Sequence, residues 1–142
     1  MITLDDSIKR DINNAFDEGF PMIVCGVTPE GEPAVSWRGT VSTVGDDRLG
    51  FWVRRGDKSA TLNLLKANPT LVLVYTNLPV KRFYMFRGKG RPVEDDALRN
   101  QVYDNSPETE RNSDPERQGI AVIVDLESVR GRGAEGLVNM KV

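Results

Sequence analysis

The sequence predicts a mainly β (α+β) protein: a six- to seven-stranded antiparallel barrel, closed or partly closed, with short helices at its periphery. Short apolar segments follow one another with tight turns between them, which is typical of hairpins and meanders. The regular alternation of strands and helices in a doubly wound parallel sheet is missing. Because 142 residues suit one compact domain, we expect residues 1–142 to form a single domain.

The first third of the chain predicts one helix and a three-stranded meander. Apolar residues between 5 and 16 recur at the spacing of one helix face, and Gly19 supplies a stop. Apolar segments over 20–27 and 33–44 flank a turn and indicate a hairpin. A third strand is expected over 49–53, after a second turn.

The rest of the chain predicts the remainder of the barrel. The strand over 70–76 has consecutive apolar residues, which indicates burial on both faces and a central place in the sheet. The segment 104–118 is too long and polar for a core element, and we expect a mobile rim that borders the functional cleft and selects substrate. Also predicted are a helix over 57–68 with Asp57 as N-cap, a strand over 81–90, a helix over 94–103 and strands over 119–126 and 127–132.

Cysteine and histidine usage excludes several kinds of site. Cys25 is the single cysteine, so no intramolecular disulfide can form. The sequence has no histidine, which rules out Cys/His zinc sites and hydrolases whose nucleophile is activated by imidazole. Acid–base chemistry near neutral pH would fall to tuned Asp, Glu, Lys, Tyr or Cys side chains. We therefore expect no metal site and chemistry supplied by a bound organic cofactor.

Charge and hydropathy patterning predict the cellular location of the protein and the kinds of partner that it lacks. Nineteen basic residues stand against 21 acidic ones, a formal charge of −2 that gives no global reason to bind nucleic acid. The N-terminal segment lacks the apolar stretch of a secretory signal, and the longest apolar runs have the length of strands. We expect a cytoplasmic protein without nucleic-acid or membrane partners.

Basic residues nevertheless gather locally. Arg38, Arg54, Arg55 and Lys58, together with Ser59, form a positive cluster just before a predicted helix, whose free N–H groups attract phosphate. The spacing of these residues fits a solvated turn equally well. Both interpretations stay open on the residues alone.

Aromatic residues and the cysteine also have two interpretations. Trp37 and Trp52 lie on predicted strands, where an indole can stack on a cofactor ring or fill the core, and filling the core is commoner. Cys25 lies in an apolar run with no cationic neighbour, so it is most simply a small buried hydrophobe.

Five runs of sequence follow one another in an order that resembles the pyridoxamine 5′-phosphate oxidase-like split β-barrel superfamily. The runs are GEPAVSWRG over 31–39, FWVRRGDKSA over 51–60, LKANP over 65–69, LVLVY over 71–75 and FRGKG over 86–90. The resemblance covers roughly residues 20–129 and rests on the order of elements. It implies a split β-barrel that forms homodimers and binds FMN at the subunit interface; some relatives bind a deazaflavin, haem or a bilin instead.

The resemblance implies a phosphate site. Arg38, with Gly39 beside it, matches the family's basic position after the first hairpin. Arg54, Lys58 and Ser59 match basic and hydroxyl positions in the loop after the next strand. These residues are expected to hold the flavin phosphate.

The resemblance also implies contacts to the flavin ring. Trp52 and Val53 match the strand that supplies an aromatic side chain and a backbone edge to the isoalloxazine. Arg82 or Phe83 matches a position that reaches the flavin of the neighbouring subunit. The chain departs from the oxidases themselves in a longer segment over 58–69, about one helical turn, which affects the register of the phosphate loop. The basic substrate-recognition residues that the oxidases carry near the C-terminus are not recognised in this sequence, so vitamin salvage is not expected.

The predicted function is that of an FMN-dependent oxidoreductase, which transfers a hydride or electrons between bound flavin and a nicotinamide or small organic substrate. Its catalytic residues are not identified by the sequence. The alternative is a non-catalytic carrier or sensor that binds flavin, a deazaflavin or a tetrapyrrole in the same cleft. A third possibility is a barrel without a working site that serves in interactions. We expect a homodimer, because residues 81–87 place apolar side chains on both faces of a strand.

Overall fold

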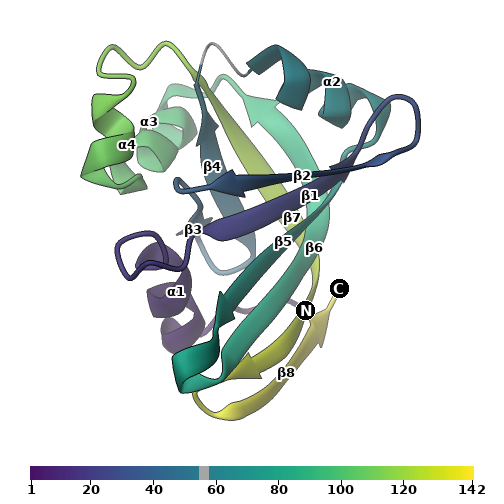
Figure 1. Ribbon diagram of the computed structural model, residues 1–142, viewed down its shortest axis with the longest axis vertical. Coiled ribbons are helices and arrows are strands. Elements are labelled where there is room, and N and C mark those ends of the chain that lie inside the picture. The colour runs from purple at the N-terminus through teal and green to yellow at the C-terminus, as the bar shows by residue number, and fades with distance from the viewer. Residues whose placement is uncertain (55–57) are drawn as a thin grey trace.

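A computed structural model describes residues 1–54 and 58–142, with the side chains of residues 58 and 59 excepted. Across this part of the chain, eight strands form one antiparallel sheet with short helices around it (Figure 1). The elements are α1 (Asp6–Asn13), β1 (Met22–Val27), β2 (Pro33–Arg38), β3 (Ser42–Val44), β4 (Arg48–Val53), α2 (Lys58–Ala67), β5 (Thr70–Asn77), the 3-10 helix η1 (Leu78–Val80), β6 (Arg82–Val93), α3 (Asp96–Asn105), α4 (Glu108–Asn112), β7 (Ile120–Gly133) and β8 (Gly136–Lys141).

The sheet curls into a split barrel because β6 and β7 are long enough to pair with strands of both halves. The strand order is β2-β1-β5-β6-β7-β4-β3, with β8 also paired to β7. β7 pairs with β4 through its first half and with β8 through its second half. The register of β6 and β7 shifts between Arg87 and Gly88, a bulge that increases the local twist. The predicted split barrel is confirmed, with one or two more strands than expected.

Two parts of the chain form strands with boundaries other than those predicted, and this accounts for the additional strands. The strand expected over 33–44 is two strands, because β2 pairs with β1 whereas β3 pairs with β4. The chain crosses between them at Thr40, whose hydroxyl accepts a hydrogen bond from the Trp52 N–H at 2.9 Å. The two strands expected over 119–126 and 127–132 are one continuous β7, and the tail supplies β8.

β5 has the central position that was expected, between β1 and β6. The expectation that it is buried on both faces is wrong, since Leu71, Leu73 and Tyr75 are buried but Val72 and Val74 are only half-buried. No helix of the described chain covers the outer face of β5, so side chains that point outward keep contact with solvent (Figure 1). The apolar run therefore has one face in the core and one apolar face outside.

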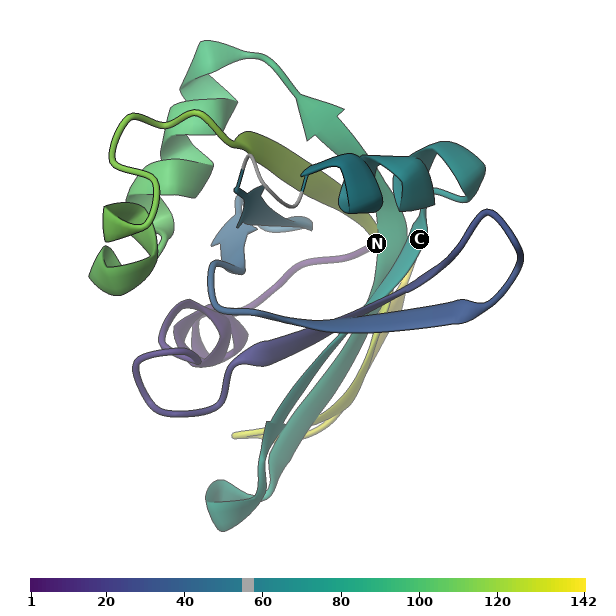
Figure 2. The same cartoon turned by 45° about the horizontal axis from the view of Figure 1, so that its top comes forward.

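Helices close the ends of the barrel rather than its outer face. Figure 2 shows α2 across one end, between the β1–β2 hairpin and β6, with α3 and α4 on another flank. No helix in the described residues is long and apolar enough to cross a membrane. The segment 104–118, expected as a loop, contains α4, which corrects that prediction.

The main core contains a buried carboxylate. Asp11 on α1 is fully buried and accepts hydrogen bonds from the Tyr84 hydroxyl at 2.6 Å and from Arg82 at 2.8 Å. Burial and the nearby Asp11 raise the pKa of the Tyr84 phenol well above its ordinary value, so this phenol stays protonated. The network fixes α1 against β6.

A second cluster holds α3 and the segment after it against β4. The Trp52 ring packs edge-on against Tyr103, 5.1 Å between centroids. Asp114 accepts hydrogen bonds from the Trp52 indole at 2.9 Å and from the N–H groups of Gly119 and Gln118 at 2.8 and 2.9 Å. Burial by itself would raise the pKa of Asp114, but these hydrogen bonds hold it below its ordinary value.

We predict that Asp114→Asn lowers the free energy of unfolding at neutral pH by about 1–3 kcal/mol, because buried donors lose a charged acceptor. Since folding lowers the pKa of Asp114, its contribution is complete well above the ordinary value of 3.8 and is lost as the pH falls through the folded value. Urea unfolding of both proteins at about pH 7 and about pH 3 measures the difference. Asp104→Asn is the control, because Asp104 pairs with Arg117 at an exposed site. A loss independent of pH would contradict the prediction.

Candidate functional site

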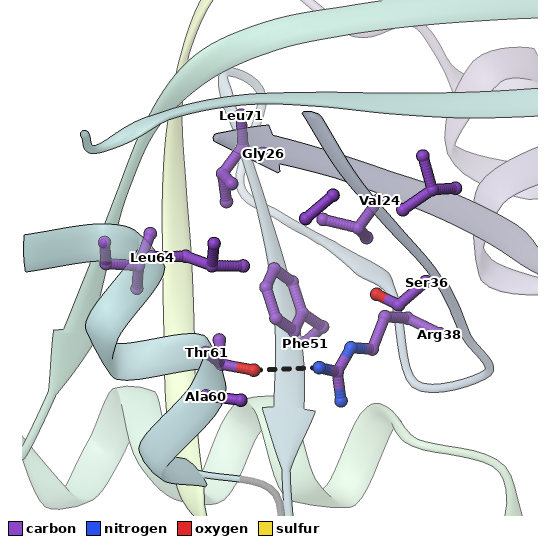
Figure 3. Close-up of a pocket in the computed structure, with 12 residues that line it drawn as sticks. Val24, Gly26, Ser36, Arg38, Phe51, Ala60, Thr61, Leu64 and Leu71 are labelled. Atoms are coloured by element: carbon purple, nitrogen blue, oxygen red, sulfur yellow. Dashed lines mark hydrogen bonds between the residues drawn. The ribbon is translucent and has the colours of Figure 1, made fainter. Parts of the chain in front are cut away.

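A small hollow lies beneath α2, where β1, β2, β4 and β5 meet (Figure 3). Alternation along β2 places Ser36 and Arg38 toward the hollow, and Trp37 away from it. Its volume is about 140 Å³, and apolar side chains such as Leu71 form most of its wall. Among the side chains that the structure describes, Arg38 is the charged one in this largely apolar space.

The contacts of Arg38 in this hollow include a hydrogen bond and a ring contact. Its guanidinium donates a hydrogen bond to Thr61 Oγ1 at 2.9 Å. It also lies 5.7 Å from the centre of the Phe51 ring, a cation–π geometry. Figure 3 shows the guanidinium pointing from β2 toward Thr61, with Phe51 beside it. The cation thus has a fixed position at the first turn of α2.

The first turn of α2 adds to the positive potential around Arg38. α2 runs for ten residues from Lys58, and its first turn contains no acidic residue. The free N–H groups of a helix N-terminus, a guanidinium and a hydroxyl are the donors that bind phosphate in proteins. The hollow is smaller than the roughly 300–1,000 Å³ of sites that enclose a drug-sized ligand. It fits a phosphate group, while a flavin ring would have to lie beyond it.

The residues expected at the phosphate lie in different settings. Arg38 is in the hollow, and Gly39 follows it where a Cβ would come within 2.6 Å of Phe16 and of Glu110 on α4. Glu110 on α4 therefore lies beside Gly39 at the end of β2, but no residue of 104–118 is among the described residues that line the hollow. Arg54 is exposed at the end of β4. Residues 55–57, including the predicted N-cap Asp57, and the side chains of Lys58 and Ser59 lie outside the described residues.

The structure does not bring Trp52, Val53 or Arg82 to the hollow. Trp52 is 4% exposed in the second cluster, and Val53 is buried in the main core. Arg82 pairs with Asp11 beside α1. In β4 it is Phe51, one position earlier, whose side chain faces the hollow. Sequence analysis missed Phe51 and Thr61. Alternation along the strand puts Phe51 on the opposite side from Trp52, and Thr61 lies in the first turn of the predicted helix, so both could have been considered.

Comparisons with known proteins agree with this geometry. Residues 8–129 match the family model described as pyridoxamine 5′-phosphate oxidase. A comparison with curated protein sequences finds no match.

Solved structures with the same fold have low sequence identity. HupZ of Group A Streptococcus has a TM-score of 0.68 at 11% identity, over 92% of this chain and 97% of that one. An FMN-binding protein from Syntrophomonas wolfei has a TM-score of 0.63 at 12% identity, over 87% and 84%. An F420 reductase has a TM-score of 0.57 at 23% identity, over 78% and 88%. Since the family model covers most of the sequence, this chain belongs to the pyridoxamine 5′-phosphate oxidase family.

Proposed function

We propose that this chain binds FMN, with the phosphate in the hollow beneath α2, and acts as an oxidoreductase on a nicotinamide or a small organic substrate. The observation that carries the proposal is Arg38, held by Thr61 at the first turn of α2 in an otherwise apolar hollow. A deazaflavin is the alternative cofactor, since one protein of the same fold is an F420 reductase. Either cofactor carries a phosphate that these donors suit.

A flavin supplies hydride or electron transfer when bound, so the protein needs to provide position rather than reactive groups. Among the described residues that line the hollow, Arg38 is the charged one, and none is a carboxylate, phenol or thiol. This end of the site would therefore anchor an anion. A flavin carrier or sensor is the second candidate function, because such a protein holds the cofactor without needing proton-transfer groups; oxidation of NADH or NADPH by the loaded protein separates the two.

We further propose that the chain is a homodimer through the outer face of its sheet. β-Register aligns Trp37, Ile23, Val74 and Met85 across β2, β1, β5 and β6 on that face. Trp37 is 75% exposed and Met85 45% exposed, so this apolar surface has no cover within the described chain. A second copy seated on this face would bury the apolar surface.

We predict that Arg38→Gln weakens FMN binding about 10- to 100-fold, because the variant loses a charge-assisted hydrogen bond of roughly 1.5–3 kcal/mol. Riboflavin lacks the phosphate, so its affinity should stay unchanged. Titration of both ligands by flavin fluorescence measures the two effects.

The control for this prediction is Lys66→Gln. Lys66 lies in the last turn of the same helix and is exposed, so the variant changes the charge of α2 without touching the hollow. Thr61→Val, which keeps the shape of the side chain, should weaken FMN less than Arg38→Gln does. Equal FMN affinity of Arg38→Gln and the parent would remove the phosphate from this hollow.

We predict a particle of twice the chain mass in light scattering at micromolar concentration. Trp37→Glu and Met85→Glu each place a charge on the apolar outer face and should shift the protein to monomers. Ala97→Glu, at an exposed position on α3 away from that face, should leave the mass unchanged. A parent protein that is monomeric with and without FMN would overturn the dimer.

A further inference from the structure

The outer face of the sheet is apolar on one side and cationic on the other. Register joins the outward side chains of neighbouring strands into rows that cross the sheet from β2 toward β8. One row consists, in strand order, of Trp37, Ile23, Val74, Met85, Arg130 and Asn139. The next row consists of Cys25, Val72, Arg87, Ser128 and Lys141. Both rows change from apolar to cationic in the same direction.

The two sides of this face complement each other. On the cationic side, Arg87 and Arg130 are exposed, and neither forms a side-chain hydrogen bond or ion pair with another described residue. On the apolar side, Trp37 is 75% exposed, and an indole face attracts a guanidinium. The exposed acids Glu30 and Glu32 lie in the turn between β1 and β2, also on the apolar side. Each side of one copy therefore suits the opposite side of a second copy.

Twofold symmetry limits how two copies can stack through this face. The axis of such a dimer lies in the plane between the two sheets and brings the same patch of both copies together. An axis across the strands would place β7 over β7 of the partner, so that cations meet cations, which costs free energy. An axis along the strands reverses the strand order, so that β7 of one copy lies over β2 of the other. The second arrangement brings unlike sides together.

We propose that the twofold axis of the homodimer runs along the strands near Val74, and that Arg130 of the partner subunit covers Trp37. This orientation rests on the homodimer of the proposed function but not on FMN binding. With the axis at Val74, the reversed row also places Ile23 opposite Met85 of the partner subunit, apolar on apolar. A guanidinium over an indole forms a cation–π contact, which is strongest where water is excluded. Each dimer contains this contact twice.

The same orientation gives the acidic turn between β1 and β2 a cationic neighbour. The axis reverses strand order but keeps position along the strands, so this turn lies over β6 of the other copy. By register the turn extends past the row of Arg87, on the side of Lys89. Glu30 and Glu32 are therefore directed toward these two cations of the other copy. Charge pairs at the rim of an interface favour one orientation and speed association.

The sign of a charge placed at position 37 tests the orientation. Trp37→Glu and Trp37→Lys both lose the apolar area of the indole, so both should dissociate more readily than the parent. The new carboxylate would face Arg130 of the partner subunit, whereas the new ammonium would be repelled by it. We expect the dimer dissociation constant of Trp37→Lys to exceed that of Trp37→Glu about tenfold or more, measured by sedimentation equilibrium.

A second pair of variants assigns the effect to Arg130. Adding Arg130→Gln should reduce the difference between Trp37→Glu and Trp37→Lys to less than about threefold, because the facing charge is gone. Arg132→Gln is the matched control, since Arg132 is an exposed cation two residues along the same face of β7 but outside the row of Trp37. Adding this control should leave the difference unchanged. Because Trp37 is largely exposed in the single chain, thermal unfolding of the diluted monomers should stay as in the parent.

The outcomes separate this orientation from the proposals on which it rests. Equal dissociation of Trp37→Glu and Trp37→Lys from a dimeric parent, or equal effects of Arg130→Gln and Arg132→Gln, would overturn the orientation and leave the homodimer. A monomeric parent would overturn the homodimer and the orientation together. Flavin titration of Arg38→Gln reads the phosphate site separately, so its failure gives a different result from either of these.

Discussion

The pairing of β6 with β7 is the interaction on which the architecture depends. It joins the β2-β1-β5 group to the β4-β3 group, and β8 extends from it. The two backbones approach so closely at the bulge that a Cβ on Gly88 would lie 2.3 Å from the Asp125 carbonyl. At Gly131, φ is +152° and a Cβ would lie 1.9 Å from the Phe83 carbonyl. Glycine at both places lets two long strands bend together and close the barrel.

This closure also creates two unlike faces on the same strands. Inside, Tyr75, Tyr84 and Phe86 fill the main core. Outside, the same strands present Val74 and Met85 beside Arg87 and Arg130. Strand alternation therefore gives these strands one side in the core and one side that faces outward. The hollow beneath α2 lies on the inward side of β2.

The sequence was sufficient for the fold class because its short apolar segments and tight turns are those of a small antiparallel barrel, although the boundaries and number of strands differ. The resemblance pointed to Arg38, which the structure places in the hollow beneath α2. The sequence was not sufficient for Trp52, since an apolar run such as Phe51–Trp52–Val53 does not show which residue faces which side. The register of β4 is set by its pairing with β7, which lies about 70 residues later in the chain. Asp114 and Trp52 are also far apart in the sequence, and no local sequence pattern predicts the hydrogen bond between them.

The dependence of β4 on β7 has a consequence for how the chain folds. β3 and β4 are made early, but the strand that pairs with β4 comes near the end of the sequence. Until β7 has been synthesised, β4 exposes unpaired backbone groups and the apolar side chains of Leu49 and Phe51. Folding should be slow for a chain of this length, since distant pairing must precede closure. During that interval the chain is open to mispairing with other strands.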